Sequence, residues 1–324
     1  MGLKPDFQIL ADNKNITGII AERLVELRID DDAGFQSDSA TIVLDDHHGE
    51  IEVPKTGVEL TIDLGYENEL QRMGIFTVDE VEISSPPYRL SISARAAKMK
   101  QSLKAPKDRS FHDISLGDLI KKISAEHDYG VSISESLAEI QLKQVDQQSE
   151  SDLNLMTRLA KESGATFKLT VNKLVFIERS KSKSVSGQNV ADISIADDQV
   201  QSYRLMTADR NKYTRVIAKY RDLESAKEVQ VSEGTGDPAF TIRRVYPDAS
   251  SAVAAARAKF ESLQRGTGSL SLSIIGDALI RAERIIELTE LRNKINERWL
   301  CRQVSHSITP NGFITNITAE TPHG

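Results

Sequence analysis

The sequence predicts a mainly β protein with an α+β insert, in which two like-folded small β-barrels share one chain. A β-motif occurs over residues 58–94 and again over residues 285–319. In each copy an aromatic residue, Phe76 or Trp299, is followed by an apolar residue at the second position after it and by a valine at the fifth. Between the copies the apolar spacing changes from alternating to helical. With 324 residues, 39% of them hydrophobic and 27% charged, the chain can form two or three globular domains, each with its own core.

Residues 1–100 are predicted to form the first β-barrel domain. Short runs with partial alternation of apolar and polar residues are separated by turns that contain Asp, Asn and Gly, which is typical of a small barrel or sandwich. Before the repeat, the expected strands cover residues 7–10, 24–29 and 39–44. The first copy of the repeat adds strands at 58–62, 76–81 and 90–92, with a turn at Pro86 and Pro87.

Residues 101–180 are predicted to form an α+β middle domain. Ser115 can cap a helix, because its hydroxyl can accept a hydrogen bond from an early backbone N–H, and apolar residues follow at helical spacing. A second helix is expected to begin within residues 149–152 and to stop at Gly164, where glycine suits a left-handed C-cap. Residues 167–177 then predict a β-hairpin.

Residues 181–324 are predicted to form the second β-barrel domain, which contains an inserted helix. A polar connector at residues 180–188 precedes it. The inserted helix is expected over the alanine-rich residues 252–264, closed by Gly266. Expected strands cover residues 202–205, 214–220 and 270–274, followed by the second copy of the repeat at 285–288, 299–304 and 313–317.

Charge and composition exclude several functional classes. A net charge of −7 argues against a sequence-wide affinity for nucleic acid or for an anionic membrane. No run of 18 apolar residues and no signal-peptide core occurs. We therefore expect that the protein folds in the cytoplasm and does not insert into a membrane. The single cysteine, Cys301, lies in a strand-like run and is interpreted as a small core side chain rather than a nucleophile.

Candidate metal and catalytic residues do not match a known motif. The acidic residues 30–32 and 38 and the segment 45–48 could supply metal ligands, but they lack the EF-hand spacing and the HExxH motif. Turns between strands are the simpler interpretation. The best acid–base pairs are His112 with Asp113 and Asp46 with His48, and His127 stands beside Glu126; surface or capping roles are expected for His112 and His127. We therefore expect no catalytic, cofactor-binding or metal site, and no enzyme.

Two further features need an interpretation. His306 falls in the second copy where Ile83 falls in the first, and an inward histidine there needs a hydrogen-bond partner. The one local basic run contains Lys98, Lys100, Lys104, Lys107 and Arg109. A solvated linker face is the favoured interpretation of this run, and docking onto an acidic partner is the alternative. As a nucleic-acid site the run lacks interleaved aromatic residues.

Three blocks of sequence together resemble the phage late control D family. The first is SLKAPKDRSF at residues 102–111, followed by SLGDLI at 115–120. The second is DQQSESDL at residues 146–153, and the third is WLCRQVSH at 299–306 with GFIT at 312–315. The blocks occur in the family order and extend over most of the chain. Phe111 replaces a usual tryptophan, and residues 282–284 lack a glycine that the family often has.

The resemblance implies a structural baseplate hub of a contractile tail, as in contractile phages and R-type tailocins, and similar to the N-terminal part of VgrG spikes. Such hubs form homotrimers in which two barrels per chain give a pseudo-hexameric ring. The ring would join the six-fold tail tube to the three-fold central spike or needle. Further implied partners are other baseplate proteins, with the tape measure protein as an additional candidate, and no specific nucleic acid. The expected location is the virion tail baseplate or a tailocin particle, and the alternative function is a receptor- or carbohydrate-binding tail protein.

Overall fold

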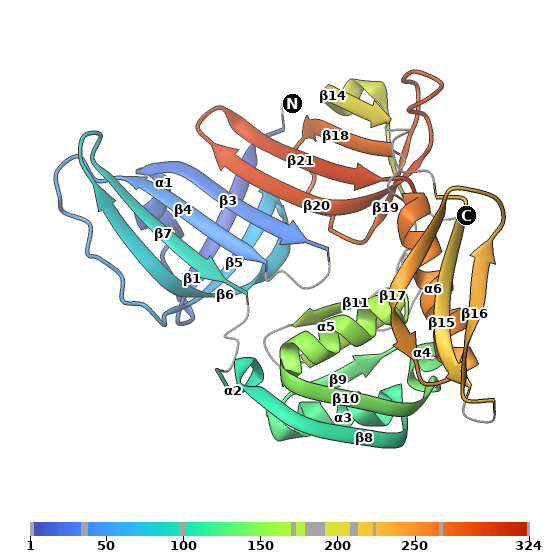
Figure 1. The fold of residues 1–324 in the computed structure, drawn as a ribbon. Coiled ribbons are helices and arrows are strands. Elements are labelled where there is room, and N and C mark those ends of the chain that lie inside the picture. Colours follow the sequence, from blue (N-terminus) through green and yellow to red (C-terminus); the bar gives the residue numbers. More distant parts are fainter. Residues whose placement is uncertain are drawn as a thin grey trace. The chain divides into compact units, whose positions relative to one another are not determined.

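The computed structural model describes residues 3–33, 38–96, 101–169, 173–178, 192–207, 213–222, 225–265 and 268–322 (Figure 1). Contacts between residues divide the chain into two compact units. The first unit contains Met1–Lys98, Ile193–Leu205 and Leu270–Ala319, and the second contains Met99–Asp192, Met206–Ser269 and Glu320–Gly324. The fold is mainly β, as the sequence predicts.

The N-terminal part of the first unit is a series of antiparallel strands with one short helix. In chain order its elements are β1 (Pro5–Ala11), β2 (Lys14–Asn15), α1 (Thr17–Ala21), β3 (Leu24–Asp32), β4 (Ser39–Asp45), β5 (Glu59–Tyr66), β6 (Glu69–Ser84) and β7 (Arg89–Arg95). Alternate residues of β4 are buried, since one face of the sheet covers a core while the other does not. That core contains Ile29, Ile42, Leu64, Phe76 and Leu90.

The C-terminal part of the first unit continues the same sheet. Its elements are β13 (Ile193–Ile195), the 3-10 turn η1 (Asp197–Gln199), β14 (Val200–Thr207), β18 (Gly268–Ile275), β19 (Ile285–Leu288), β20 (Arg298–Thr309) and β21 (Gly312–Glu320). A second core lies here and contains Leu270, Ile286, Trp299, Cys301 and Val304. Burial raises the pKa of the Cys301 thiol to about 12, which agrees with its interpretation as a core side chain.

The two parts join where β20 pairs antiparallel with β3, with His306 opposite Ile29. The main path of the 13-stranded sheet has the order β14-β18-β21-β20-β3-β4-β7-β6-β5-β1-β2, and β19 and β13 branch from β20. Among the described strands this path has two ends and does not close into a barrel. The two closed barrels of the sequence analysis therefore remain a prediction, whereas two separate cores on one sheet are observed.

The internal repeat corresponds to two sets of three neighbouring strands. In the first copy β5 pairs with β6 and β6 with β7, and in the second β19 pairs with β20, which neighbours β21. The equivalent aromatics Phe76 and Trp299 are both buried. The equivalence ends at Ile83, which is exposed, whereas His306 is buried. Ile83 lies opposite Leu90 near the end of β6, after a register shift between Val78 and Glu80.

The second unit contains three small sheets and five helices among its described residues. Its first segment comprises α2 (Gln101–Lys104), β8 (Pro106–Ser115), α3 (Leu116–Glu126), β9 (Gly130–Ile133), α4 (Glu135–Ala138), β10 (Gln141–Ser151), α5 (Asp152–Glu162), β11 (Ala165–Leu169) and β12 (Lys173–Glu178). Its second segment comprises β15 (Arg215–Asp222), β16 (Lys227–Gly234), β17 (Ala239–Tyr246) and α6 (Ala249–Arg265). Strand β8 pairs with β10, β12 lies between β11 and β9, and β15 lies between β16 and β17.

The predicted helix ends of the middle segment are largely confirmed. The Ser115 hydroxyl accepts a hydrogen bond from Asp118 N at 3.0 Å and caps α3. Helix α5 is capped by Ser151, whose hydroxyl accepts from Asn154 N at 3.2 Å. After α5, Gly164 has a φ of 64°, the left-handed conformation that favours glycine. The predicted hairpin is confirmed: β11 and β12 pair antiparallel, from Ala165 opposite Glu178 to Leu169 opposite Leu174.

The grouping of contacts differs from the three consecutive domains of the sequence analysis. The sequence predicts one domain over residues 181–324, whereas β15–β17 and α6 belong to the second unit. The alanine-rich face of α6 packs on β15, where Ala252 and Ala256 share a core with Val216 and Ala218. Local periodicity predicts such a helix and such a strand, but it does not tell which neighbour they pack against. The connector at 180–188 and Gly266 lie outside the described residues.

No helix among the described residues combines the length and the apolar character needed to cross a membrane.

Candidate functional site

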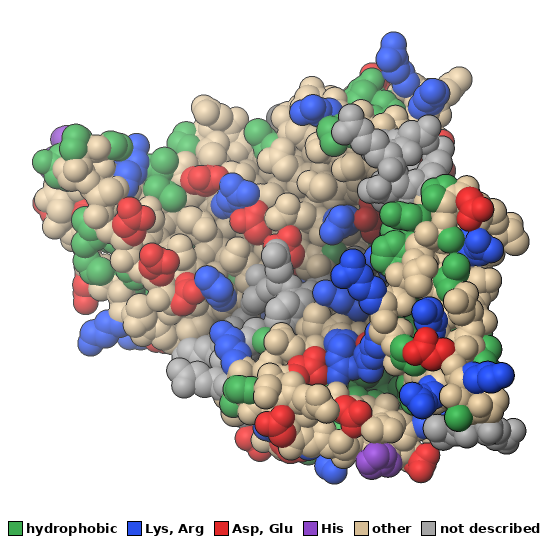
Figure 2. Space-filling view, in the orientation of Figure 1, with side chains coloured by type: hydrophobic (Ala, Val, Ile, Leu, Met, Phe, Trp, Pro, Cys, Tyr) green, Lys and Arg blue, Asp and Glu red, His purple; other side chains and the backbone are tan. Residues whose placement is uncertain are grey.

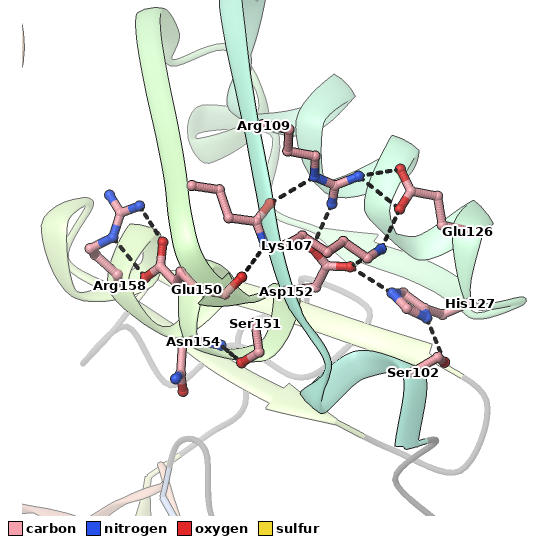
Figure 3. Close-up of polar contacts among 11 residues, drawn as sticks. Ser102, Lys107, Arg109, Glu126, His127, Glu150, Ser151, Asp152, Asn154 and Arg158 are labelled. Atoms are coloured by element: carbon pink, nitrogen blue, oxygen red, sulfur yellow. Dashed lines mark hydrogen bonds and ion pairs between the residues drawn. The ribbon is translucent and has the colours of Figure 1, made fainter.

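A cluster of charged and polar side chains, partly open to solvent, surrounds the buried carboxylate of Asp152 in the second unit (Figure 3). Asp152 lies in the first turn of α5 and is fully buried. Its Oδ2 atom lies 2.6 Å from Lys107 Nζ and 2.7 Å from His127 Nε2. Its Oδ1 atom accepts hydrogen bonds from the Arg109 guanidinium and, at 2.8 Å, from the Gln147 amide. We call these residues, together with Glu126, the charge network.

Glu126 supplies the second carboxylate of the charge network, from the last turn of α3. Its Oε2 atom accepts from Lys107 Nζ at 2.8 Å, and Arg109 donates to Oε1 and Oε2 at 2.7 and 2.8 Å. Burial alone would raise the pKa of Glu126, but the hydrogen bonds from Lys107 and Arg109 lower it. Two cations thus oppose two carboxylates, and the charges of these four groups balance.

The ionised state of Asp152 is strongly favoured. Burial alone would raise the pKa of its carboxyl group, because charge is disfavoured away from water. Hydrogen bonds from Lys107, His127 and Gln147, together with the positive charge of Arg109, outweigh burial and lower the pKa of Asp152 to about 2. Because Asp152 carries no proton, His127 Nε2 donates to its carboxylate, and His127 Nδ1 lies 2.8 Å from the Ser102 hydroxyl.

The pairing of β8 with β10 positions the network. Lys107 and Arg109 are two positions apart on β8, so their side chains point to the same face. Arg109 lies opposite Gln147, and Lys107 lies opposite Glu150, with a register shift between these two pairs. Within that shift Ser149 has a φ of 45°. The bulge allows β10 to keep Gln147 on the face of the two cations while the chain turns into α5.

A second set of ion pairs extends from α5 to β17. Glu150 accepts from Arg158 Nε at 3.0 Å and from its NH2 group at 2.7 Å, a two-point contact that fixes the guanidinium. Arg158 also lies 3.7 Å from Glu162, which pairs with Arg244 of β17. Burial raises the pKa of Glu162 even though Arg244 and Arg158 act against it. These pairs connect the two segments of the second unit.

Ser102, His127 and Asp152 form a hydrogen-bonded chain with the order found in serine hydrolases. In those enzymes the carboxylate stabilises a positive charge that develops on the imidazole. Here the same carboxylate faces Lys107 and Arg109, so an imidazolium would lie beside two existing cations. Ser102 does not line the three cavities of about 490, 800 and 380 Å³ found among the described residues. The chain of hydrogen bonds therefore fits a structural role and not a nucleophilic one.

The same cluster contains a possible set of metal ligands. Ligand atoms of Glu126, His127 and Asp152 lie within 4.8 Å of one another. Lys107 Nζ, however, contacts both carboxylates at 2.8 and 2.6 Å and already neutralises them. A metal ion at this point would have to displace the ammonium group. The donor set is therefore occupied by an internal cation and does not fit a metal.

The structure corrects the interpretation of the basic run as a solvated linker face. Lys107 and Arg109 point into the charge network rather than into solvent, because the adjacent strand and helix bring two acids to the same face. Lys104 is exposed, as a linker residue would be. Lys98 and Lys100 lie outside the residues that the structure describes.

The other candidate residues do not assemble into a site. His112 and Asp113 are exposed neighbours on β8. Asp46 is buried and accepts a hydrogen bond from Ile51 N at 3.2 Å, which is a turn role, while His48 is exposed.

His127 was expected at the surface or at a cap, and only the cap is confirmed. Its backbone ends α3, but its side chain is buried against Asp152. Sequence reasoning missed Asp152 and Gln147 as partners. The available signal was that the first two family blocks carry complementary charges, with cations in one and acids in the other.

The third family block also forms one local structure, around His306 in the first unit. The Thr315 hydroxyl accepts from Asp277 N at 3.0 Å, so its own proton points to His306 Nδ1, 3.0 Å away. His306 Nε2 then donates to Ile280 O at 3.1 Å. Burial, helped by the charge of Arg281, lowers the pKa of His306 to about 4. The expected hydrogen-bond partner of this inward histidine is thus found within the same unit.

Comparison with known proteins gives the same assignment as the three blocks. The family model described as phage tail baseplate hub (GPD) matches residues 46–312. The probable baseplate hub protein of Escherichia phage P2 is 30% identical over 361 aligned positions, which cover 98% of this chain and 93% of that protein.

Two solved structures share the fold. A 43 kDa tail protein of prophage MuSo2 from Shewanella oneidensis has a TM-score of 0.73 at 16% identity, covering 97% of both chains. The E. coli c3393 protein, a component of the type VI secretion system, has a TM-score of 0.58 at 13% identity, covering 93% of this chain and 74% of that one. The match to the family model and the identity to the phage P2 protein together show that this chain belongs to the phage tail baseplate hub family, whose members are structural proteins of the phage tail.

Proposed function

We propose that this baseplate hub is a trimeric symmetry adaptor that joins the six-fold tail tube to the three-fold central spike. The main support for this proposal is the pairing of β20 with β3. Through this pairing, both copies of the repeat belong to one sheet. Three chains would then present six similar sets of strands, which is the number that a six-fold tube offers. The relatives' names supply the location, the baseplate of a phage tail.

The free ends of the sheet support assembly into a ring. At one end β14 pairs only with β18 among the described strands, and Tyr203 and Met206 on it are 40% and 54% exposed. At the other end β2 covers only residues 10 and 11 of β1. Unpaired strand edges are sites where another chain can add its own strand. Two different edges on one sheet suit head-to-tail contacts, and such contacts close into a ring when the rotation allows.

On this proposal two sets of strands supply two like-folded, barrel-like halves: β1–β7 in one half, and β13, β14 and β18–β21 in the other. Residues 101–180 lie between β7 and β13 in sequence. The partners are the central spike, the tail tube and other baseplate proteins, with the tape measure protein as a further candidate. The particle is a phage tail or a tailocin, assembled in the host cytoplasm. No catalysis, cofactor or metal is part of the proposal. A receptor-binding protein would carry clustered exposed aromatics. The strongly exposed ones among the described residues are Tyr88, in the turn between β6 and β7, and Tyr203 on β14, which is far from those strands in the sheet order.

The proposal is tested by mass photometry and electron microscopy of the purified chain, alone and mixed with its folded spike protein. We expect rings of three chains in the mixture. Tyr203→Glu should reduce the trimer fraction at least several-fold, because it places a charge beside the β14 edge. Val253→Glu, which makes the same charge change at an exposed apolar residue of α6, is the matched control and should leave the trimer intact. Monomers in the presence of folded spike would rule the adaptor out.

A further inference from the structure

A groove of about 800 Å³ lies in the second unit between α5 with the start of β11 on one side and β17 with α6 on the other. We call it the basic groove. Figure 2 shows Lys and Arg side chains gathered around a hollow next to β17, whose position is given in Figure 1. Three cations line it, Lys161 from α5, Arg243 from β17 and Lys259 from α6. None of the residues that line the basic groove belongs to the charge network or to the strand edges of the proposed ring.

The cations of the basic groove have no acidic partner among the described residues. Neither Lys161, Arg243 nor Lys259 forms an ion pair there, and Lys259 Nζ lies 4.8 Å from the ring centre of Phe240. The one acid in the lining, Glu162, is already paired with Arg244. The groove therefore carries an excess of positive charge on a chain whose net charge is −7. Such a local reversal of sign favours an acidic partner.

The groove follows the edge of a strand. Four consecutive residues of β17, from Phe240 to Arg243, line it. Phe240 and Ile242 are half-buried, whereas Thr241 and Arg243 are exposed, so side chains from both faces of the strand border the groove. The groove therefore runs along the strand's edge, where the pairing with β15 shifts register after Thr241. Strand β17 pairs with β15 on its other side, and no described strand pairs with this edge. Its backbone N–H and C=O groups are therefore placed to bind an extended segment.

The lining favours a peptide over a single-stranded nucleic acid. Nucleic acids bind such grooves by stacking bases on open aromatic faces. Here the Phe240 ring is covered by Lys259, and the Tyr246 ring is buried with Arg244 5.4 Å from its centre. The small side chains Ala255 and Ala258 leave room for apolar side chains on the α6 wall. Apolar room beside unpaired cations fits a segment in which apolar and acidic residues alternate.

We infer that the basic groove is a docking site for an extended acidic segment of a partner protein, which adds to the edge of β17 and places its carboxylates beside Lys161 and Arg243. The site differs from the strand edges of the first unit, so it can be occupied whether or not a ring forms.

Fluorescence polarisation with a synthetic peptide of alternating valine and glutamate tests this inference. The peptide should bind the full-length chain, and added salt should weaken binding. Lys161→Glu and Arg243→Glu should each weaken it roughly tenfold or more, as expected for reversal of a close charge. Arg257→Glu is the matched control, because Arg257 is exposed on α6, pairs with Glu261 and does not line the groove. Circular dichroism of each variant checks that the fold is kept.

Two further probes separate strand addition from general charge attraction. The same peptide with N-methyl groups on alternate backbone nitrogens should lose most of its affinity, because it cannot pair with a strand edge. A thymidine oligonucleotide of equal charge should bind at least tenfold more weakly than the peptide. Absence of peptide binding, equal binding by Arg243→Glu, equal binding of the N-methylated peptide, or tighter binding of the oligonucleotide would each overturn the inference.

Discussion

At the scale of single residues, the chain uses charge inside its second unit to fix structure. Asp152 is fully buried but contacts two cations, an amide and an imidazole, so its desolvation is offset by several direct contacts. A buried ion pair contributes little compared with an apolar replacement, but removal of one partner leaves the others uncompensated. The network therefore makes the arrangement of β8, β10, α3 and α5 specific, since other arrangements would leave buried charges unpaired.

Asp152→Asn tests this role directly. Among the described residues, the change leaves Lys107 and Arg109 with Glu126 as their one acidic partner, so we expect a loss of about 3–5 kcal/mol in the free energy of unfolding. Urea denaturation followed by circular dichroism measures it. Asp118→Asn is the matched control, because Asp118 forms an exposed pair with Lys121 at 3.6 Å, worth about 0–1 kcal/mol. Equal losses in the two variants would show that the network does not hold the fold.

His306 gives a prediction for the dependence of stability on pH. Its pKa is lowered from 6.5 to about 4 in the folded chain, because the buried ring resists protonation. As pH falls from 6.5 towards 4, the unfolded chain takes up a proton that the folded chain does not, so stability should fall across this window. His306→Gln cannot titrate and should lose this part of the slope. His112→Gln, at an exposed position, should keep it. The measurement is the urea midpoint of each variant at several pH values between 6.5 and 4. If His306→Gln kept the full dependence of stability on pH, His306 would not be its source.

At the scale of elements, the sequence predicts strands and helices well and their partners poorly. The cap at Ser115, the turn at Gly164 and the repeat strands follow from local chemistry and are confirmed. The inward direction of Lys107 depends on a bulge in β10 that pairs it with residues far along the chain, and no local rule contains that information. The same reason explains why the sequence groups α6 with residues 181–324, although the helix packs on β15: its alanine face is clear from the sequence, but the sheet that receives it is not.

At the scale of the whole molecule, the chain combines a continuous sheet with a separate α+β unit, and its only tryptophan lies in the sheet. Trp299 is buried in the second core of the first unit, where its indole N–H donates to Ile295 O at 3.0 Å. Its fluorescence therefore reports on the first unit alone, whereas far-ultraviolet circular dichroism reports on both units. The charge network lies entirely in the second unit. Each unit has its own buried cores, which is the condition for separate unfolding transitions.

We therefore predict that Asp152→Asn shifts part of the circular dichroism transition to lower urea and leaves the Trp299 fluorescence transition in place. The physical reason is that the substitution removes contacts only from the unit that lacks the tryptophan. Leu272→Ala is the reciprocal variant, because Leu272 shares the buried core of Trp299, and it should lower the fluorescence midpoint by removing about 2–5 kcal/mol from the first unit. A fluorescence midpoint that moves with Asp152→Asn as far as the circular dichroism midpoint would mean that the two units unfold as one. The hub would then behave as a single cooperative body, and mutations in the α+β unit would weaken the sheet that we propose for the ring.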